Sequence, residues 1–250
     1  MSLISRAYLS PVQNKLFQAI WEWLAAHSDL GFHPDPVGAD THDPDVLFMC
    51  GLPTGQRIDR YEPLVAAVLA QERYGGRPIY FSDLVVREET TEPPRPSWRI
   101  AYNDKESFSG WIAPRWGLAA LGLEPDAMTW VVTGSHLVSL EAVSKGTADA
   151  AGIDSMVLDL VSGDSAPAAG LVTMESFGPW PAPPISTSVG MDPSMRAELA
   201  STLTSMHEDL GGAHLLATWG VERLAAVDAA EYERLARFAE TTAGQSDFRP

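Results

Sequence analysis

Short apolar stretches alternate along the chain with longer stretches in which apolar positions recur every three or four residues. The first pattern is typical of buried strands and the second of amphipathic helices. Near the N-terminus these patterns predict a strand over 3–8 and a helix over 13–27. Because the two patterns keep alternating, the sequence favours an α/β fold with largely parallel sheets.

The remaining predicted elements follow the same alternation. Apolar runs predict strands over 45–49, 83–87, 98–102, 129–133, 148–153 and 171–174. Helical spacing predicts helices over 63–71, 109–121 and 135–145, and two more that begin near 192 and 228. The polar, turn-rich segment 33–45 is expected to be a loop.

Capping residues and helix breakers mark several of these helix ends. Asp192 is expected to be an N-cap, and Gly211-Gly212 is expected to end the helix that it opens. Asp228 and Glu231 have the spacing of a capping box for the last helix, which is expected to reach about residue 240. Pro114 is expected in or near the first turn of its helix, and Gly146 stops the helix over 135–145.

Two proline-rich stretches, 92–97 and 178–185, bracket a central section of the chain. Such a pair of breaks indicates that the chain leaves one lobe, builds a second and returns. We therefore expect one lobe of residues 1–82 with 187–250 and an inserted lobe of residues 83–186. Surface loops also use proline, so the prolines alone leave a single domain open.

Charge and composition exclude several partners. The 250 residues are 45% hydrophobic, and their formal net charge is −16. This acidic surface disfavours nucleic acid and anionic membranes, so any anion site must be built locally from N–H and hydroxyl donors. Cys50 is the only cysteine, which excludes an intrachain disulfide and a cysteine-based zinc cluster.

The chain shows neither a signal peptide nor an apolar run of the roughly 20 residues that a membrane helix needs. As it stands we therefore expect a cytoplasmic protein without membrane insertion, or a periplasmic one if a signal was removed.

The segment Asn103–Gly110 follows a predicted strand and precedes a predicted helix. Ser107 and Ser109 supply hydroxyl donors, and Gly110 lets a ligand approach the backbone. Together with the free N–H groups of the first helical turn, they favour an anion such as phosphate, phosphonate or carboxylate. Ordinary helix capping by serine is the alternative.

A second strand-to-helix segment, Thr133-Gly134-Ser135-His136, repeats this arrangement. Ser135 and His136 could donate to the same oxyanion, because successive loops of one sheet converge at its carboxyl edge. Asp154 ends the following strand and could bind an amine or orient His136. A capping Ser135, a packed His136 and a helix-capping Asp154 remain the alternatives.

Catalysis, metals and cofactors receive little support. The chain has no G-x-S-x-G elbow, and Ser135 and His136 are adjacent, which disfavours a hydrolytic triad. The His and Asp residues of segment 33–45 match no metal-binding spacing, and the chain has no P-loop or G-x-G-x-x-G. We expect no catalytic residue, metal or cofactor.

Taken together, these motifs resemble the phosphate/phosphite/phosphonate-binding proteins of ABC transport systems. The family motifs T-G-S-H-x-x-S and A-D-x-A-x-I-D are matched at 133–139 and 148–154, and N-x-x-S-x-S-G is matched at 103–110 with one extra residue before the first serine. The resemblance implies a two-lobed type II periplasmic-binding-protein (Venus flytrap) fold with two mixed, mainly parallel sheets and a hinge. It implies that the oxyanion is contacted by Ser107, Ser109, Gly110, Ser135 and His136.

By the same resemblance, Asp154 would contact the rest of the ligand and Tyr80 would line the cleft. Trp180 is our own candidate for an aromatic wall. The implied partner beyond the ligand is an ABC permease, and we expect a monomer. Two alternatives stay open: an enzyme on the same fold with His136 and Asp154 as acid and base, and a ligand-sensing module.

Overall fold

The computed structural model describes residues 2–28, 31–34, 43–161 and 168–243. The chain divides into two compact units: unit 1 is Met1–Ile79 with Pro181–Ala236, and unit 2 is Tyr80–Trp180 with Arg237–Pro250. The first two crossings fall a few residues earlier than the sequence-based lobe boundaries, and a third crossing after Ala236 falls inside the segment 187–250 that the sequence analysis placed in one lobe. The last helix, α8 (Ala229–Ala243), contributes to both units. That the units are lobes closing on a ligand stays a prediction.

Unit 1 is built on a six-stranded sheet, sheet A, with strand order β11-β4-β10-β3-β1-β2. The pairs β1–β2 and β1–β3 are parallel, whereas β10 is antiparallel to β3 and β4, and β11 to β4. Its strands are β1 (Ser2–Tyr8), β2 (Gly31–Pro34), β3 (Val46–Met49), β4 (Tyr61–Leu69), β10 (Pro184–Ser188) and β11 (Val221–Ala226).

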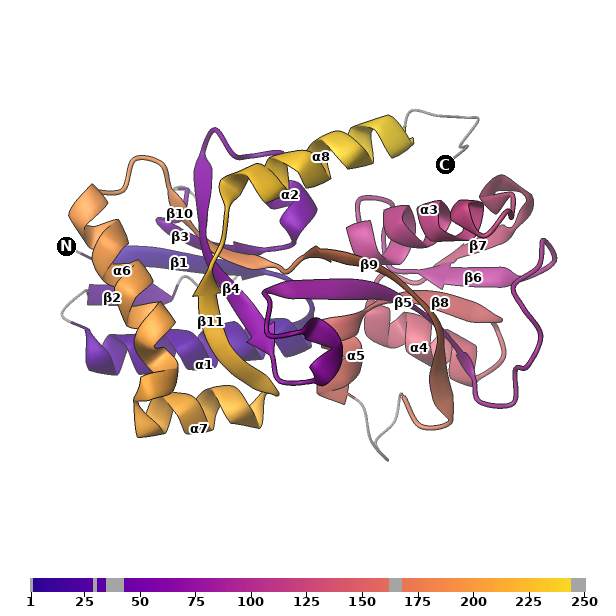
Figure 1. The fold of residues 1–250 in the computed structure, drawn as a ribbon, viewed down its shortest axis with the longest axis horizontal. Helices are drawn as coiled ribbons and strands as arrows, with labels where there is room; N and C mark the ends of the chain where they lie inside the picture. Colours follow the sequence, from indigo (N-terminus) through magenta and orange to yellow (C-terminus); the bar gives the residue numbers. More distant parts are fainter. Residues whose placement is uncertain (1, 29–30, 35–42, 162–167, 244–250) are drawn as a thin grey trace. The chain divides into compact units, whose positions relative to one another are not determined.

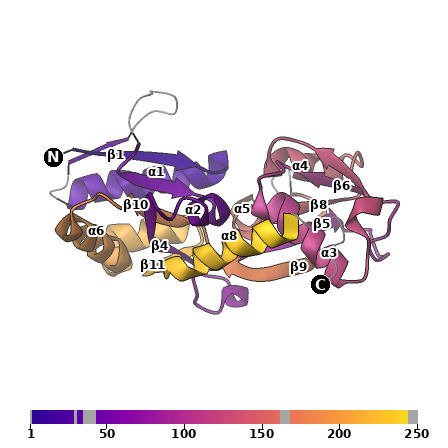
Figure 2. The same ribbon diagram turned by 90° about the horizontal axis from the view of Figure 1, so that it is seen from above.

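Helices cover both faces of sheet A. Figures 1 and 2 show α1 on one face and α2 on the other, and α7 packs beside α1. Ser10 caps α1 through a capping box with Gln13, and the Tyr232 hydroxyl of α8 donates to the Ala182 carbonyl at 2.7 Å. The helices and 3-10 turns of this unit are α1 (Pro11–His27), α2 (Gly51–Gly55), η1 (Glu72–Tyr74), α6 (Pro193–Ser205), η4 (Met206–Glu208) and α7 (Leu210–Thr218).

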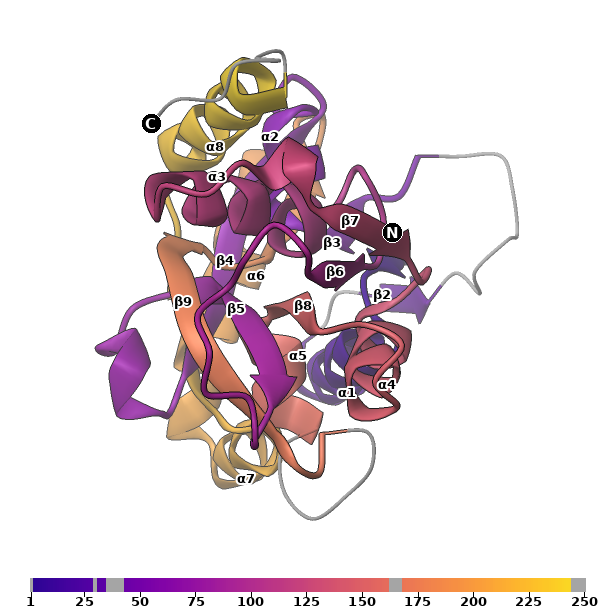
Figure 3. The same cartoon turned by 90° about the vertical axis from the view of Figure 1, so that its right-hand side faces the viewer.

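Unit 2 is built on a five-stranded sheet, sheet B, with order β7-β6-β8-β5-β9. Figure 3 shows α3 on one face of this sheet and α4 and α5 on the other. Its strands are β5 (Ile79–Arg87), β6 (Arg99–Tyr102), β7 (Thr129–Val132), β8 (Ala150–Asp154) and β9 (Leu171–Pro181). Its helical elements are a π-turn η2 (Phe108–Ile112), α3 (Ala113–Ala120), a 3-10 turn η3 (Pro125–Ala127), α4 (His136–Ser144) and α5 (Ser155–Val161).

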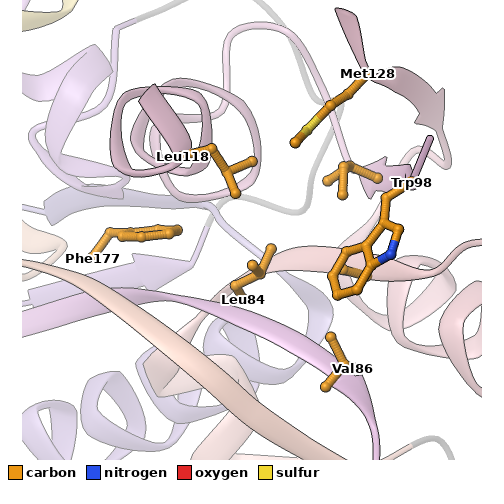
Figure 4. Close-up of a cluster of buried hydrophobic side chains, with 8 residues drawn as sticks. Leu84, Val86, Trp98, Leu118, Met128 and Phe177 are labelled. Carbon is orange, nitrogen blue, oxygen red and sulfur yellow. The ribbon is translucent and has the colours of Figure 1, made fainter. Parts of the chain in front are cut away.

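Alternate residues of β5, β6 and β8 fill two separate cores, one on each face of sheet B. Leu84 packs toward α3 with Leu118 and Phe177, as Figure 4 shows. Val85 packs on the opposite face with Leu140 of α4. The strict alternation is the geometry expected of a strand buried on both faces.

Apart from the edge strand β11, the two sheets have the same strand order: β2-β1-β3-β10-β4 in sheet A corresponds to β7-β6-β8-β5-β9 in sheet B. In sheet A, β10 lies between β3 and β4, and in sheet B, β5 lies between β8 and β9. β10 and β5 are each the first strand that the chain forms after it crosses from one unit to the other. This repeated order confirms a two-sheet α/β architecture, although antiparallel pairs are as prominent as parallel ones. The expectation of mainly parallel sheets was therefore wrong in that detail.

Two predicted elements were wrong. Residues 63–71, predicted as a helix, lie mostly in strand β4. This strand pairs on both sides in sheet A, with β11 and β10, and is mostly buried, so its apolar run mimics helical spacing. Its Pro63 pairs with Ser186 where the β4–β10 register shifts, a position at which a missing N–H is tolerated.

Gly211-Gly212, predicted to end a helix, instead lies in the first turn of α7. Asp209 caps that helix by accepting from the Gly212 N–H at 2.8 Å. A Cβ atom on Gly212 would lie 2.1 Å from the Met206 carbonyl oxygen. Close packing of the preceding turn, and not helix termination, explains this glycine.

The loop predicted over 33–45 is only partly described. Residues 33–34 belong to strand β2, and 35–42 lie outside the described residues. The proline stretch 92–97 lies between β5 and β6 inside unit 2, whereas 178–185 spans the return crossing to unit 1. Among the helices that the structure describes, none combines the length and apolar character required to cross a bilayer.

Candidate functional site

The carboxyl ends of β6, β7 and β8 meet at one edge of sheet B, because β6 is parallel to both neighbours. The segments that leave these ends contact one another. The Gly134 N–H donates to the Asn103 carbonyl at 3.0 Å, and the Thr133 hydroxyl donates to the Tyr102 carbonyl at 2.9 Å. The structure thus places the two predicted anion-binding segments side by side.

The first segment brings Asn103, Ser107 and Gly110 together. Ser107 caps the π-turn by accepting from the Gly110 N–H at 3.0 Å. A Cβ atom on Gly110 would lie 1.8 Å from Asn103 Oδ1, so any larger residue would force the Asn103 side chain to move. Asn103 Oδ1 is buried and has no hydrogen-bond partner in the described part of the chain. Sequence reasoning gave Asn103 no role, and its place at the start of the motif was the only signal.

Ser109 and His136 form the contact that joins the two segments. Ser109 Oγ lies 3.2 Å from His136 Nε2, and the two residues are 5% and 7% exposed. Ser109 stands in the first turn of a continuous helix formed by η2 and α3, and His136 is the first residue of α4. The first N–H groups of a helix have no intrahelical acceptor and attract negative charge. Two such helix starts therefore adjoin one hydroxyl–imidazole pair.

Burial makes His136 a neutral imidazole at physiological pH. Desolvation lowers the pKa of His136 from 6.5 to about 4, and this outweighs the backbone of Gly152, which favours the charged form. No hydrogen bond of good geometry reaches its Nδ1 atom within the described residues. A neutral ring donates from one nitrogen and accepts at the other. With the proton on Nε2, the ring donates to Ser109 Oγ and leaves the serine O–H for another acceptor.

The second segment is held by its own hydroxyl groups. Ser135 is the N-cap of α4 and accepts from the Val138 N–H at 3.2 Å. Thr133 Oγ1 lies 2.6 Å from the Oγ of Ser139, which is fully buried. Gly134 adopts φ +86°, a conformation that favours glycine. Ser135 therefore serves as a helix cap, while Thr133 and Ser139 fix the loop.

Asp154 is buried at the end of β8, where its carboxylate caps the next helix. Asp154 Oδ1 accepts from the Met156 N–H at 2.8 Å and from the Val157 N–H at 3.4 Å. Helix capping is the role that the sequence analysis gave as the alternative to ligand binding for Asp154. A role for Asp154 toward a ligand stays a prediction.

The two predicted aromatic residues lie in different surroundings. Tyr80 is buried at the start of unit 2, in β5. Trp180 is half-buried, and its Nε1 donates to the Phe177 carbonyl at 2.9 Å. Its ring contacts Phe108 at 4.8 Å and Phe238 at 5.2 Å between centroids. Trp180 thus belongs to an aromatic cluster of unit 2, and its role as a ligand wall stays a prediction.

Segment 33–45 shows no metal site in its described part. Asp45 Oδ2 accepts from the Ile4 N–H at 2.8 Å, and Asp43 pairs with Arg60. Asp35 and His42 lie outside the described residues. Over residues whose side chains are described, no three His, Cys, Asp or Glu side chains gather as metal ligands would.

Comparison with known proteins decides the family. The model of a family described as "ABC transporter, phosphonate, periplasmic substrate-binding protein" matches residues 40–232. The chain belongs to this family. Its members are the substrate-binding components of transporters, which confirms the resemblance carried by the three motifs and the role of a binding protein. No curated protein sequence matches the chain.

Solved structures of the family and its neighbours share the fold. PhnD1 from Prochlorococcus marinus in complex with methylphosphonate is 17% identical, with a TM-score of 0.78 over 98% of this chain and 99% of that one. A binding component of an ABC phosphonate transporter from Pseudomonas aeruginosa is 15% identical, with a TM-score of 0.75 over 99% and 90%. A Xanthomonas citri protein bound to ATP is 14% identical, with a TM-score of 0.70 over 98% and 99%. These likenesses confirm the type II binding-protein fold.

Proposed function

We propose that this family member binds a small oxyanion of the phosphonate or phosphate class at the carboxyl edge of sheet B. The observation that carries the proposal is the buried contact between Ser109 Oγ and His136 Nε2 at 3.2 Å, located where two helices begin. The Ser109 hydroxyl, oriented by the imidazole, and the first-turn N–H groups are donors that suit an oxyanion. The methylphosphonate bound by the Prochlorococcus neighbour supports this ligand class.

The donors in this proposal carry no formal charge. The chain has a net charge of −16, and the imidazole of His136 is neutral because its pKa is about 4. Affinity would therefore come from desolvated donors that converge on the ligand, and not from long-range attraction. Neutral donors also keep their hydrogen-bonding capacity across the neutral pH range.

Ser107, Gly110 and Ser135 would shape the rim of this site. Ser107 and Ser135 accept from helix N–H groups, so each hydroxyl proton is available to a ligand. Gly110 leaves the backbone accessible. Asp154 would complete the site by holding the start of α5 in place.

The family assignment supports an ABC permease as the partner and an extracytoplasmic place of action. Delivery to a permease requires that the ligand leaves unchanged. Incubation with methylphosphonate followed by ³¹P NMR should return only the starting compound, whereas any new phosphorus signal would favour an enzyme on the same fold.

A thermal-shift screen tests the ligand class. Methylphosphonate, aminoalkylphosphonates, phosphate and phosphite should raise the melting temperature, because a ligand that binds only the folded state stabilises it. Sulfonates and carboxylates of matched size are the comparison set. If no phosphorus oxyanion shifts the melting temperature, the proposed ligand class is wrong.

A further inference from the structure

We propose that Ser82 is a positioning residue for the oxyanion site, acting on the backbone of Ser109 and so on the side chain that faces His136. This inference rests on the proposed function of the Ser109–His136 pair. Ser82 itself would not touch the ligand. Its hydroxyl would set the geometry of the helix start from which the ligand contact is made.

The Ser109 carbonyl, at the start of the helix, needs a hydrogen-bond donor from outside that helix. In an α-helix the Ser109 carbonyl would accept from the N–H of Ala113. Here the Ala113 N–H donates to the Phe108 carbonyl instead, because residues 108–112 form a π-turn. The next residue, Pro114, has no N–H. The helix therefore offers the Ser109 carbonyl no α-helical or π-helical donor.

Ser82 supplies the missing donor. Its Oγ donates to the Ser109 carbonyl at 2.7 Å, and its exposed fraction is 0%. A Cβ atom on Gly152 would lie only 3.1 Å from this carbonyl oxygen, so β8 packs tightly against the same place. Water has little room to replace the hydroxyl, and an unsatisfied buried carbonyl is costly. The helix start would relax to another geometry if the donor were removed.

The location of Ser82 connects this bond to the rest of unit 2. Ser82 lies in β5, near the crossing after Ile79, and pairs in register with Asp154 of β8. The neighbouring Phe81 N–H donates to Ser155 Oγ at 2.9 Å, at the start of α5. The strand by which the chain enters unit 2 thus holds the helix start that carries Ser109 and also the start of α5.

The test compares Ser82→Ala with Ser82→Thr, which keeps the hydroxyl, and with Ser186→Ala as a matched control. Ser186 is also 0% exposed, but it lies in β10 of unit 1 and its hydroxyl has no partner among the described residues. Two quantities are measured: the affinity for methylphosphonate and for inorganic phosphate by calorimetry, and the His136 ring ¹⁵N and ¹H shifts of the ligand-free protein.

We expect Ser82→Ala to weaken binding about tenfold, equivalent to about 1.4 kcal/mol for one hydrogen bond, and to shift the His136 ring signals. Ser82→Thr should lose stability through its added methyl group yet keep affinity and ring shifts near wild type. Ser186→Ala should change neither quantity. If Ser82→Ala does not fold, Ser82→Cys keeps the volume with a weaker donor, and a smaller loss is expected.

Wild-type affinity and unchanged His136 signals in Ser82→Ala would overturn the inference and reduce Ser82 to a packing residue. Failure of the proposed function looks different, because Ser109→Ala and His136→Ala would then also bind like wild type. The ring shifts of the ligand-free protein decide the role of Ser82 even if neither probe binds.

Discussion

A Cβ atom on Gly152 would lie 2.4 Å from Cγ of Pro114, so the middle of β8 and the first turn of α3 pack with no room for a side chain. A proline ring cannot rotate away as a flexible side chain can. This contact supports the helix start that carries Ser109. It also explains why this chain has glycine at position 152, which the family motif leaves variable.

Replacing Gly152 by alanine should therefore destabilise the protein. We expect Gly152→Ala to lower the free energy of unfolding by about 1–3 kcal/mol, because the added methyl group forces a backbone shift. Urea denaturation measures this change. Gly190→Ala is the control, because its Cβ would meet nothing closer than Ser188 Oγ at 3.7 Å. Equal stability of the two variants would contradict the packing described here.

Gly110→Ala should show the same kind of conflict with Asn103, whose Oδ1 lies 1.8 Å from the new Cβ. We expect a loss of about 1–3 kcal/mol in unfolding free energy. The double variant Asn103→Ala/Gly110→Ala removes the opposing atom and should recover part of the loss. If stability in the double variant falls by the simple sum of the two single losses, the clash is not the cause.

His136 predicts a pH dependence of stability. Its pKa is about 4 in the folded protein and 6.5 in its ordinary range, so the unfolded chain binds the proton more readily. Stability from this group is complete above about pH 6.5 and is lost as the pH falls from there to about 4, by at most about 3 kcal/mol. Urea unfolding of wild type and His136→Gln between pH 8 and pH 4 isolates this contribution. Parallel curves for the two proteins would contradict a buried neutral imidazole.

Trp180 should contribute mainly to the packing of unit 2. Trp180→Ala removes ring contacts with Phe108, Trp116 and Phe238 and should cost about 3 kcal/mol of unfolding free energy. Val132→Ala, at a position 65% exposed, should change stability by less than about 0.5 kcal/mol. A Trp180→Ala variant of normal stability but weak ligand binding would instead favour the aromatic-wall role.

Alternation of apolar runs and helical spacing was enough to predict an α/β fold, and the three motifs placed the candidate loops. The pattern failed at β4, since a strand buried on both faces has no polar face to reveal its period. The pattern also failed at position 212, where glycine is required because the Met206 carbonyl packs against the backbone.

Only part of the candidate site could be predicted from the sequence. Ser109 and His136 were each predicted as donors, but their contact depends on the parallel pairing of β6 and β7, which brings residues 27 positions apart together. The hydrogen bond from Ser82 could not be predicted from the sequence, because it replaces the helical donors that the Ser109 carbonyl lacks in a π-turn followed by a proline. Neither local pattern indicates that the donor lies on a distant strand. Such contacts between segments require the fold.

The most direct test of the central claim is a calorimetric double-mutant cycle with methylphosphonate on wild type, Ser109→Ala, His136→Ala and the double variant. We predict that each single variant loses about 1–3 kcal/mol of binding free energy and that the double variant loses less than the sum, because the two side chains act through one hydrogen bond. Wild-type affinity in all three variants would contradict an oxyanion site at the Ser109–His136 pair.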